Sequence, residues 1–91
     1  MAATYAADPP ELIRTVELEG LTLLFQRRSG MTHILAPPAP QILEALAQGP
    51  ATAKEIAGRI AERFELEGSD PVAVIAARLA ELEAPGLVWR L

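Results

Sequence analysis

Nine residues mark the change from strand-like to helix-like sequence in this 91-residue chain: Arg27-Arg28-Ser29-Gly30-Met31-Thr32-His33-Ile34-Leu35. The segment Arg28-Ser29-Gly30 predicts a turn, because glycine adopts positive φ without strain. Met31–Leu35 predicts a short strand, which the prolines from Pro37 onward end because they supply no backbone donor. Segments before this stretch have the pattern of strands and segments after it the pattern of helices, so we expect a small sheet followed by a helical layer.

Two further strands are predicted upstream, over residues 12–18 and 21–26, with a turn at Glu19-Gly20 between them. The first alternates loosely and is expected to be half-buried, with Leu12, Val16 and Leu18 on its inner face and Thr15, Glu17 and Glu19 in solvent. In the third strand Met31, His33 and Leu35 face one way and Thr32 and Ile34 the other. Together they predict a three-stranded antiparallel meander whose outer strands are the first and the third.

Three helices follow in the sequence. The first is predicted over residues 38–48, and the second starts after a capping box formed by Thr52 and Glu55. The third has Ser69 or Asp70 as its cap and Pro71 near its first position, and it ends at Pro85-Gly86.

Residues 87–91 are an apolar tail that either pairs as a strand or tucks under the helices. Residues 1–10 end in paired prolines and are expected to be a flexible arm, with residues 11–91 as a single domain. The predicted class is α+β and winged-helix-like, with the meander placed before the three helices and a short strand or tail at the end.

Composition excludes several functions. The chain has a net charge of −4, which disfavours phosphate binding, and the third helix carries Arg78 against Glu81 and Glu83, which argues against DNA binding. The absence of cysteine excludes disulfides and thiolate chemistry and fits the reducing cytoplasm. No stretch has the roughly 20 apolar residues of a membrane span.

No constellation of residues indicates catalysis. His33 is the sole histidine and has no acid or cysteine near it in sequence, so a structural or recognition role is favoured over nucleophilic or metal chemistry. The sequence leaves open whether its side chain faces a groove or the core. The glutamates are spread over helix exteriors and a cap, and the six glycines form no phosphate-binding loop. We expect no catalytic residue, cofactor or metal.

The third strand suggests a binding role, because Met31–Leu35 has neither the charge nor the proline that usually blunts an exposed edge. An extended peptide, or a segment of a partner protein, could add beside it, with Ile75, Leu79 and Leu82 of the third helix lending apolar pockets. On these grounds a covered edge has the same weight as an edge that binds a peptide. Either the tail or a second copy of the chain could cover it. A structural homodimer and a winged-helix DNA-binding regulator are the competing hypotheses of other classes.

The sequence also resembles the PqqD family, and more narrowly the peptide chaperones of the HPr-rel-A system. The resemblance is carried by residues 29–35, by Ile42-Leu43-x-x-Leu46, by Gly49-Pro50-x-Thr52-x-x-Glu55-Ile56-Ala57, and by Leu79-x-x-Leu82-Glu83-x-Pro85-Gly86-Leu87-Val88. It implies a RiPP recognition element, which binds a precursor peptide along the third strand and third helix and presents it to a modifying enzyme. The family name also implies a partner related to the HPr kinases.

By position, the resemblance implies these peptide contacts: Met31, Thr32, His33, Ile34, Leu35, Ile75, Arg78, Leu79 and Leu82. The cluster Pro37-Pro38-x-Pro40 is denser in proline than the family pattern, and we expect it to shorten the groove at that end.

Overall fold

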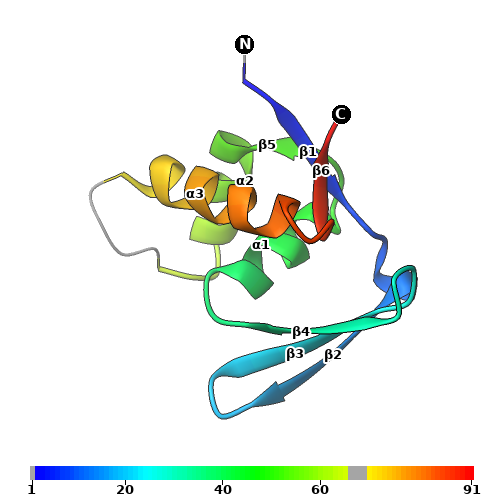
Figure 1. The fold of residues 1–91 in the computed structure, drawn as a ribbon. Coiled ribbons are helices and arrows are strands. Elements are labelled where there is room, and N and C mark those ends of the chain that lie inside the picture. Colours follow the sequence, from blue (N-terminus) through cyan, green and yellow to red (C-terminus); the bar gives the residue numbers. More distant parts are fainter. Residues whose placement is uncertain (1, 66–69) are drawn as a thin grey trace.

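A computed structural model describes residues 2–65 and 70–91, and it confirms the predicted α+β class. Three helices lie over a three-stranded sheet, and a second small sheet packs against α1 and α3 (Figure 1). The strands are β1 (Thr4–Ala7), β2 (Ile13–Leu18), β3 (Leu21–Gln26), β4 (Met31–Leu35), β5 (Ala51–Thr52) and β6 (Val88–Arg90), with a 3-10 turn, η1, at Pro10–Leu12. The helices are α1 (Ala39–Leu46), α2 (Ala53–Ala61) and α3 (Pro71–Glu83).

The predicted meander is present as the antiparallel sheet β2-β3-β4, so β4 is an edge strand of the described structure. Directly paired residues of neighbouring strands share a face of the sheet. One face, formed by the rows Thr15–Leu24–His33 and Glu17–Thr22–Leu35, points toward the helices. We call the opposite face, which carries Arg14, Val16, Leu18, Leu21, Leu23, Phe25, Thr32 and Ile34, the outer face.

The helix starts follow the predicted capping chemistry. The Thr52 hydroxyl accepts from the Glu55 N–H at 3.2 Å, and the Glu55 carboxylate accepts from the Thr52 N–H at 2.9 Å, which completes the capping box. Asp70 caps α3 by accepting from the Ala73 N–H at 3.1 Å, whereas Ser69, the other candidate, lies outside the described residues. Helix α1 is shorter at both ends than the predicted 38–48.

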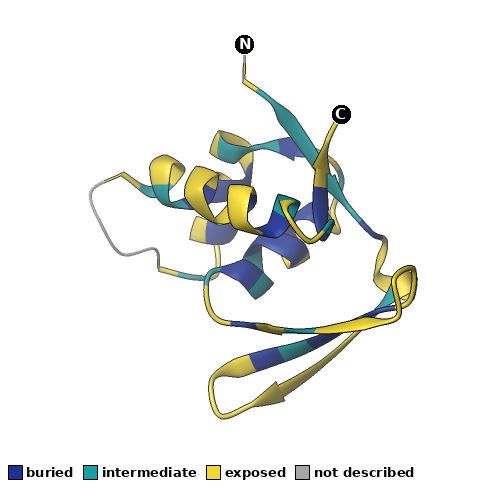
Figure 2. Cartoon of the chain, in the orientation of Figure 1, coloured by how far each residue is buried: buried dark blue, intermediate teal, exposed yellow. Residues whose placement is uncertain are grey.

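Aliphatic side chains from the helices and from both sheets form one core (Figure 2). The members with at most 1% exposure are Leu24, Ile42, Ala51, Ile56, Ile75, Leu79 and Val88. Leu87 and Val88, at the start of the predicted tail, belong to this core, and Val88–Arg90 pair with β1, which is the first of the two predicted alternatives for the tail. The core therefore fixes the position of α3 relative to the β2-β3-β4 sheet.

The expectation of a flexible amino-terminal arm is wrong for Thr4–Ala7. These residues form β1, which pairs with β5 on one side and with β6 on the other. Asp8, directly after the strand, is only 7% exposed. The pattern was missed because β1 is four residues long and its partners are more than 40 residues away in the sequence, so no local alternation announces it.

The orientation of β2 also differs from the prediction. Val16 and Leu18, expected to be inward, lie on the outer face and are 51% and 54% exposed. Thr15 and Glu17 are exposed, as expected, but they lie on the sheet face that points toward the helices. The alternation itself is real, but which face is covered depends on where the helices pack, and a strand's own sequence does not contain that information.

Candidate functional site

A groove of about 610 Å³ runs between strand β4 and helix α3. Its floor and walls come from five segments: the strand, the turn that leaves it, the start of α1, one side of α3, and the turn after α3. The lining residues are Thr32, His33, Ile34, Leu35, Ala36, Pro37, Ala39, Arg78, Glu81, Leu82, Pro85 and Leu87. Figure 1 shows the two elements that flank the groove, with β4 in teal and α3 in orange.

The backbone of β4 is paired on one side only. Within residues 2–65 and 70–91 its sole strand partner is β3, so its other side presents N–H and C=O groups to the groove region. The predicted tail does not cover this edge, because its residues Val88–Arg90 pair with β1 instead. One of the two covers considered for the edge is thereby excluded for the described chain.

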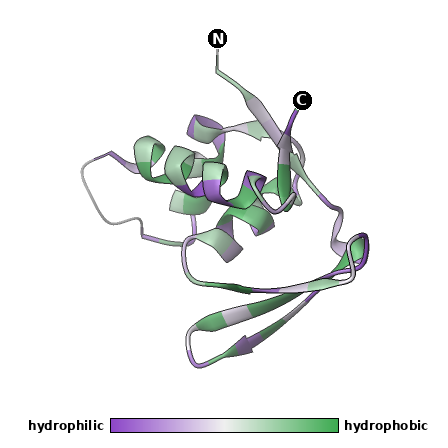
Figure 3. Ribbon diagram, viewed as in Figure 1, coloured by the Kyte–Doolittle hydropathy of each residue, from purple (hydrophilic) through white to green (hydrophobic). Residues whose placement is uncertain are grey.

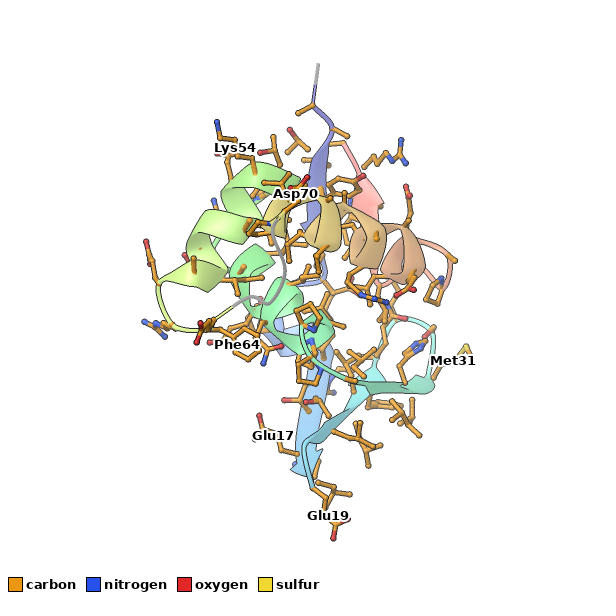
Figure 4. The ribbon with its side chains drawn as sticks, turned by 90° about the vertical axis from the view of Figure 1, so that its left-hand side faces the viewer. Glu17, Glu19, Met31, Lys54, Phe64 and Asp70 are labelled. Carbon is orange, nitrogen blue, oxygen red and sulfur yellow. The ribbon has the colours of Figure 1, made fainter. Side chains whose placement is uncertain are left out.

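Six of the nine predicted contact residues line the groove: Thr32, His33, Ile34, Leu35, Arg78 and Leu82. The other three do not. Met31 lies at the far end of β4 and is 58% exposed (Figure 4). Ile75 and Leu79 have 0% exposure in the core, so they support α3 from within and present no surface to a ligand.

His33 is half-buried and lies at the junction of strand and groove. Its Nε2 atom is buried and has no hydrogen-bond partner among the described atoms. Buried polar atoms in proteins are usually satisfied, so an unpaired imidazole nitrogen beside a groove is a position at which a ligand's polar group or a water can be accommodated. The sequence left open whether this side chain faces the groove or the core. It lies on the sheet face that points toward the helices and it also lines the groove, so it borders both.

The charged side chains that line the groove, Arg78 and Glu81, both lie on α3 at its outer rim. Arg78 Nη1 donates to both carboxylate oxygens of Glu81, at 2.9 and 2.6 Å. Both side chains are exposed, so the pair contributes little to stability. Arg78, the one basic residue within α3, is therefore already neutralised, and α3 lacks the free positive charge that a DNA recognition helix requires.

Sequence reasoning missed the groove residues that lie outside the strand and the helix face. Glu81 was assigned to a solvent face. Ala36, Pro37 and Pro85 were assigned to breaks between elements, Ala39 to the first helix and Leu87 to the apolar tail. Glu81 could have been predicted from the sequence, because it lies three residues after Arg78 and the two therefore share one side of a helix. Pro37 lines the groove, so the proline cluster borders it at this end.

A buried polar cluster ties the end of the sheet to the turn after α3. The Asp8 carboxylate accepts from Gln26 Nε2 at 2.8 Å and from Arg28 Nε at 3.2 Å. Arg28 also donates to the Gly86 carbonyl at 2.9 Å and stacks over the Trp89 ring, with 5.4 Å between Cζ and the ring centre. This anchor connects β1, the β3–β4 turn and the α3–β6 turn, and it thereby holds one end of the groove.

The carboxyl of Glu55, outside the groove, shows the electrostatics of a helix start. The pKa of the Glu55 carboxyl is lowered, mainly by the hydrogen bond from the Thr52 backbone and then by the Thr52 side chain, which is the electrostatics of a helix cap. Across the described residues no three His, Cys, Asp or Glu side chains gather as a metal site. None of the helices in the described ranges has the length and apolarity needed to cross a membrane.

No family model matches the sequence, and no curated protein matches it. A solved structure described as "Lasso peptide synthetase B1 complexed with the leader peptide" has a similar fold, with a TM-score of 0.62 over 93% of this chain and 96% of that chain. The sequences are 24% identical over this match. The chain thus has the fold of lasso peptide synthetase B1.

Proposed function

We propose that this chain is a non-catalytic peptide-binding domain that adds an extended peptide beside β4 and presents it to a partner enzyme. The observation that carries the proposal is the free edge of β4 directly beside a groove lined by α3. Strand addition uses these two features together, because the backbone edge supplies affinity and the adjacent pockets read alternate side chains. The similar fold belongs to a protein whose structure holds a leader peptide, which supports the same use of this fold.

The groove also favours a particular kind of ligand. Leu35, Leu82 and Leu87 give it a buried apolar floor, while the Arg78–Glu81 pair at the rim can exchange partners with a charged side chain. We therefore infer a peptide that inserts one or two aliphatic side chains and places a charge near α3.

The finer assignments follow the sequence resemblance. We propose that the domain is a PqqD-type RiPP recognition element of the HPr-rel-A branch, with a precursor peptide as ligand and an HPr-kinase-related protein as partner. We place it in the cytoplasm, consistent with its lack of cysteine.

This proposal is tested by titrating the isotope-labelled chain with synthetic peptides whose sequences are encoded near its gene, while backbone amide shifts are followed. We expect backbone amide shifts in Met31–Leu35 and along the groove side of α3. Ala36→Trp fills the groove and should weaken binding at least tenfold. The matched control Ala80→Trp places the same side chain on α3 at an exposed position outside the groove and should bind normally.

Shifts confined to another surface, or equal effects of the two tryptophans, contradict the assignment of the site. Binding of duplex DNA at low salt with a steep salt dependence would instead favour the regulator hypothesis.

A further inference from the structure

The outer face of the β2-β3-β4 sheet is apolar and uncovered. Five of its side chains are among the exposed large hydrophobic residues of the described chain: Val16 (51%), Leu18 (54%), Leu21 (44%), Phe25 (40%) and Ile34 (69%). Parts of these strands are green, for hydrophobic residues, in Figure 3 and yellow, for exposed residues, in Figure 2. Single exposed hydrophobic residues are ordinary, but a contiguous set on one sheet face is typical of an interaction surface.

Strand β2 has its polar residues on the sheet face that points toward the helices and its apolar residues on the outer face. Thr15 and Glu17 lie on the side of the helical layer but are themselves exposed, and Val16 and Leu18 are 51% and 54% exposed on the outer face. A half-buried strand normally has the opposite arrangement, because apolar side chains gain free energy by leaving water. The sequence of β2 is therefore suited to a second layer on the outer face, which this chain does not itself provide in its described residues.

Charges of opposite sign lie near the two ends of β2. Arg14 occupies one end of β2, in the row with Phe25 and Thr32, and Glu19 follows the other end, at the tip of the β2–β3 hairpin (Figure 4). A two-fold axis that lies between two stacked sheets and crosses the strands at right angles reverses the strand direction. An axis that passes near Val16 brings Arg14 of one copy close to Glu19 of the other twice, and it places the two Val16 side chains near the centre.

We propose that the outer face stacks on the same face of a second copy of this chain to form a two-fold symmetric dimer. Three strands of up to six residues cover roughly 14 by 20 Å at ordinary strand spacing. This is roughly 280 Å², about a third of the ~800 Å² that a standard specific interface buries per partner, so the face is smaller than a standard interface. The dimer is accordingly a weak, concentration-dependent one.

This dimer does not require the proposed peptide binding, because the two use different surfaces of the sheet. Stacking uses the direction normal to the sheet, whereas strand addition at β4 uses the direction within the sheet. The second copy therefore covers the outer face and leaves the β4 edge open, and failure of one proposal leaves the other standing.

Sedimentation analysis of the full chain from about 1 to 500 µM tests the proposal. We expect monomer at the lowest concentration and mostly dimer at the highest, consistent with an interface of modest size. Val16→Arg should weaken dimerisation at least tenfold, because it buries two charges at the symmetry axis. The matched control Val72→Arg changes a valine that is 38% exposed on α3, and it should leave dimerisation unchanged.

A charge exchange supplies the test of orientation. Arg14→Glu and Glu19→Arg should each weaken the dimer severalfold, and the double variant should recover most of the loss. A chain that stays monomeric at 500 µM overturns the proposal. A dimer that tolerates Val16→Arg, or that loses equally with Val72→Arg, overturns it as well and points to another contact, such as pairing of β4 edges. Single losses without recovery overturn the two-fold arrangement.

Discussion

Replacement of Asp8 by alanine tests whether the amino-terminal segment is an integral part of the domain. The Asp8 carboxylate is 7% exposed and accepts hydrogen bonds from Gln26 at 2.8 Å and from Arg28 at 3.2 Å. Alanine removes the acceptor that both donors share. A flexible arm would tolerate the change, whereas an anchor should not.

The magnitude follows from the burial of the two donors. A hydrogen bond to a charged group contributes about 1.5–3 kcal/mol, and the Gln26 bond is fully buried, so it should contribute within that range. The Arg28 side chain is 52% exposed, so its ion pair is screened and adds at most about 1 kcal/mol. Gln26 keeps the Gly86 carbonyl at 3.3 Å as a partial substitute. We therefore expect a loss of about 2–3 kcal/mol in the free energy of unfolding.

Chemical denaturation at pH 7 measures this loss, and thermal unfolding should show a midpoint lowered by roughly 8–24 °C in a domain of this size. Asp70→Ala is the control, because Asp70 is an exposed helix cap whose removal costs about 1 kcal/mol. Double-mutant cycles should give a larger coupling for Asp8 with Gln26 than with Arg28. If Asp8→Ala costs no more than Asp70→Ala, or if the order of the couplings is reversed, the reasoning is refuted.

Three further predictions concern the core and the α2 cap. Leu79→Ala should lower the free energy of unfolding by about 2–5 kcal/mol, because Leu79 has 0% exposure, whereas Leu91→Ala at a 73% exposed position should change it little; denaturant titration compares them. Thr52→Ala should cost about 0.5–2 kcal/mol by the same assay, since it removes the hydroxyl of the capping box. The pKa of Glu55 is lowered from 4.5, so its contribution is present above pH 4.5 and disappears as pH falls through the lowered value; Glu55→Gln should flatten the acid side of the stability profile.

Local chemistry made much of the fold predictable. Strands β3 and β4 have the predicted bounds, because Gly20 and Gly30 mark their turns and both have positive φ, at 83° and 72°. The capping box at Thr52 and the proline at the first position of α3 fixed two helix starts for the same reason. Each of these signals is complete within a few residues of the chain.

The errors share one cause, which is information held outside the local sequence. Strand β1 exists because Ala51–Thr52 and Val88–Arg90 lie on either side of it, and no periodicity within four residues reveals that. Helical spacing placed Ile75 and Leu79 correctly on one stripe of α3, but it could not tell the stripe that faces the core from the side that borders the groove. The groove residues are instead about a quarter-turn away, at Arg78, Glu81 and Leu82.

The sheet β2-β3-β4 offers two surfaces at right angles, and Ile34 belongs to both. Its side chain is 69% exposed on the outer face, and it also lines the groove at the β4 edge. A peptide that adds beside β4 would extend the sheet by one strand and enlarge the outer face next to Ile34. If both proposals hold, peptide binding should therefore strengthen the weak dimer, and by thermodynamic reciprocity dimerisation should strengthen peptide binding by the same factor. Substitution of Ile34 would disturb both events, which is why Val16 and Ala36 are the positions that separate them.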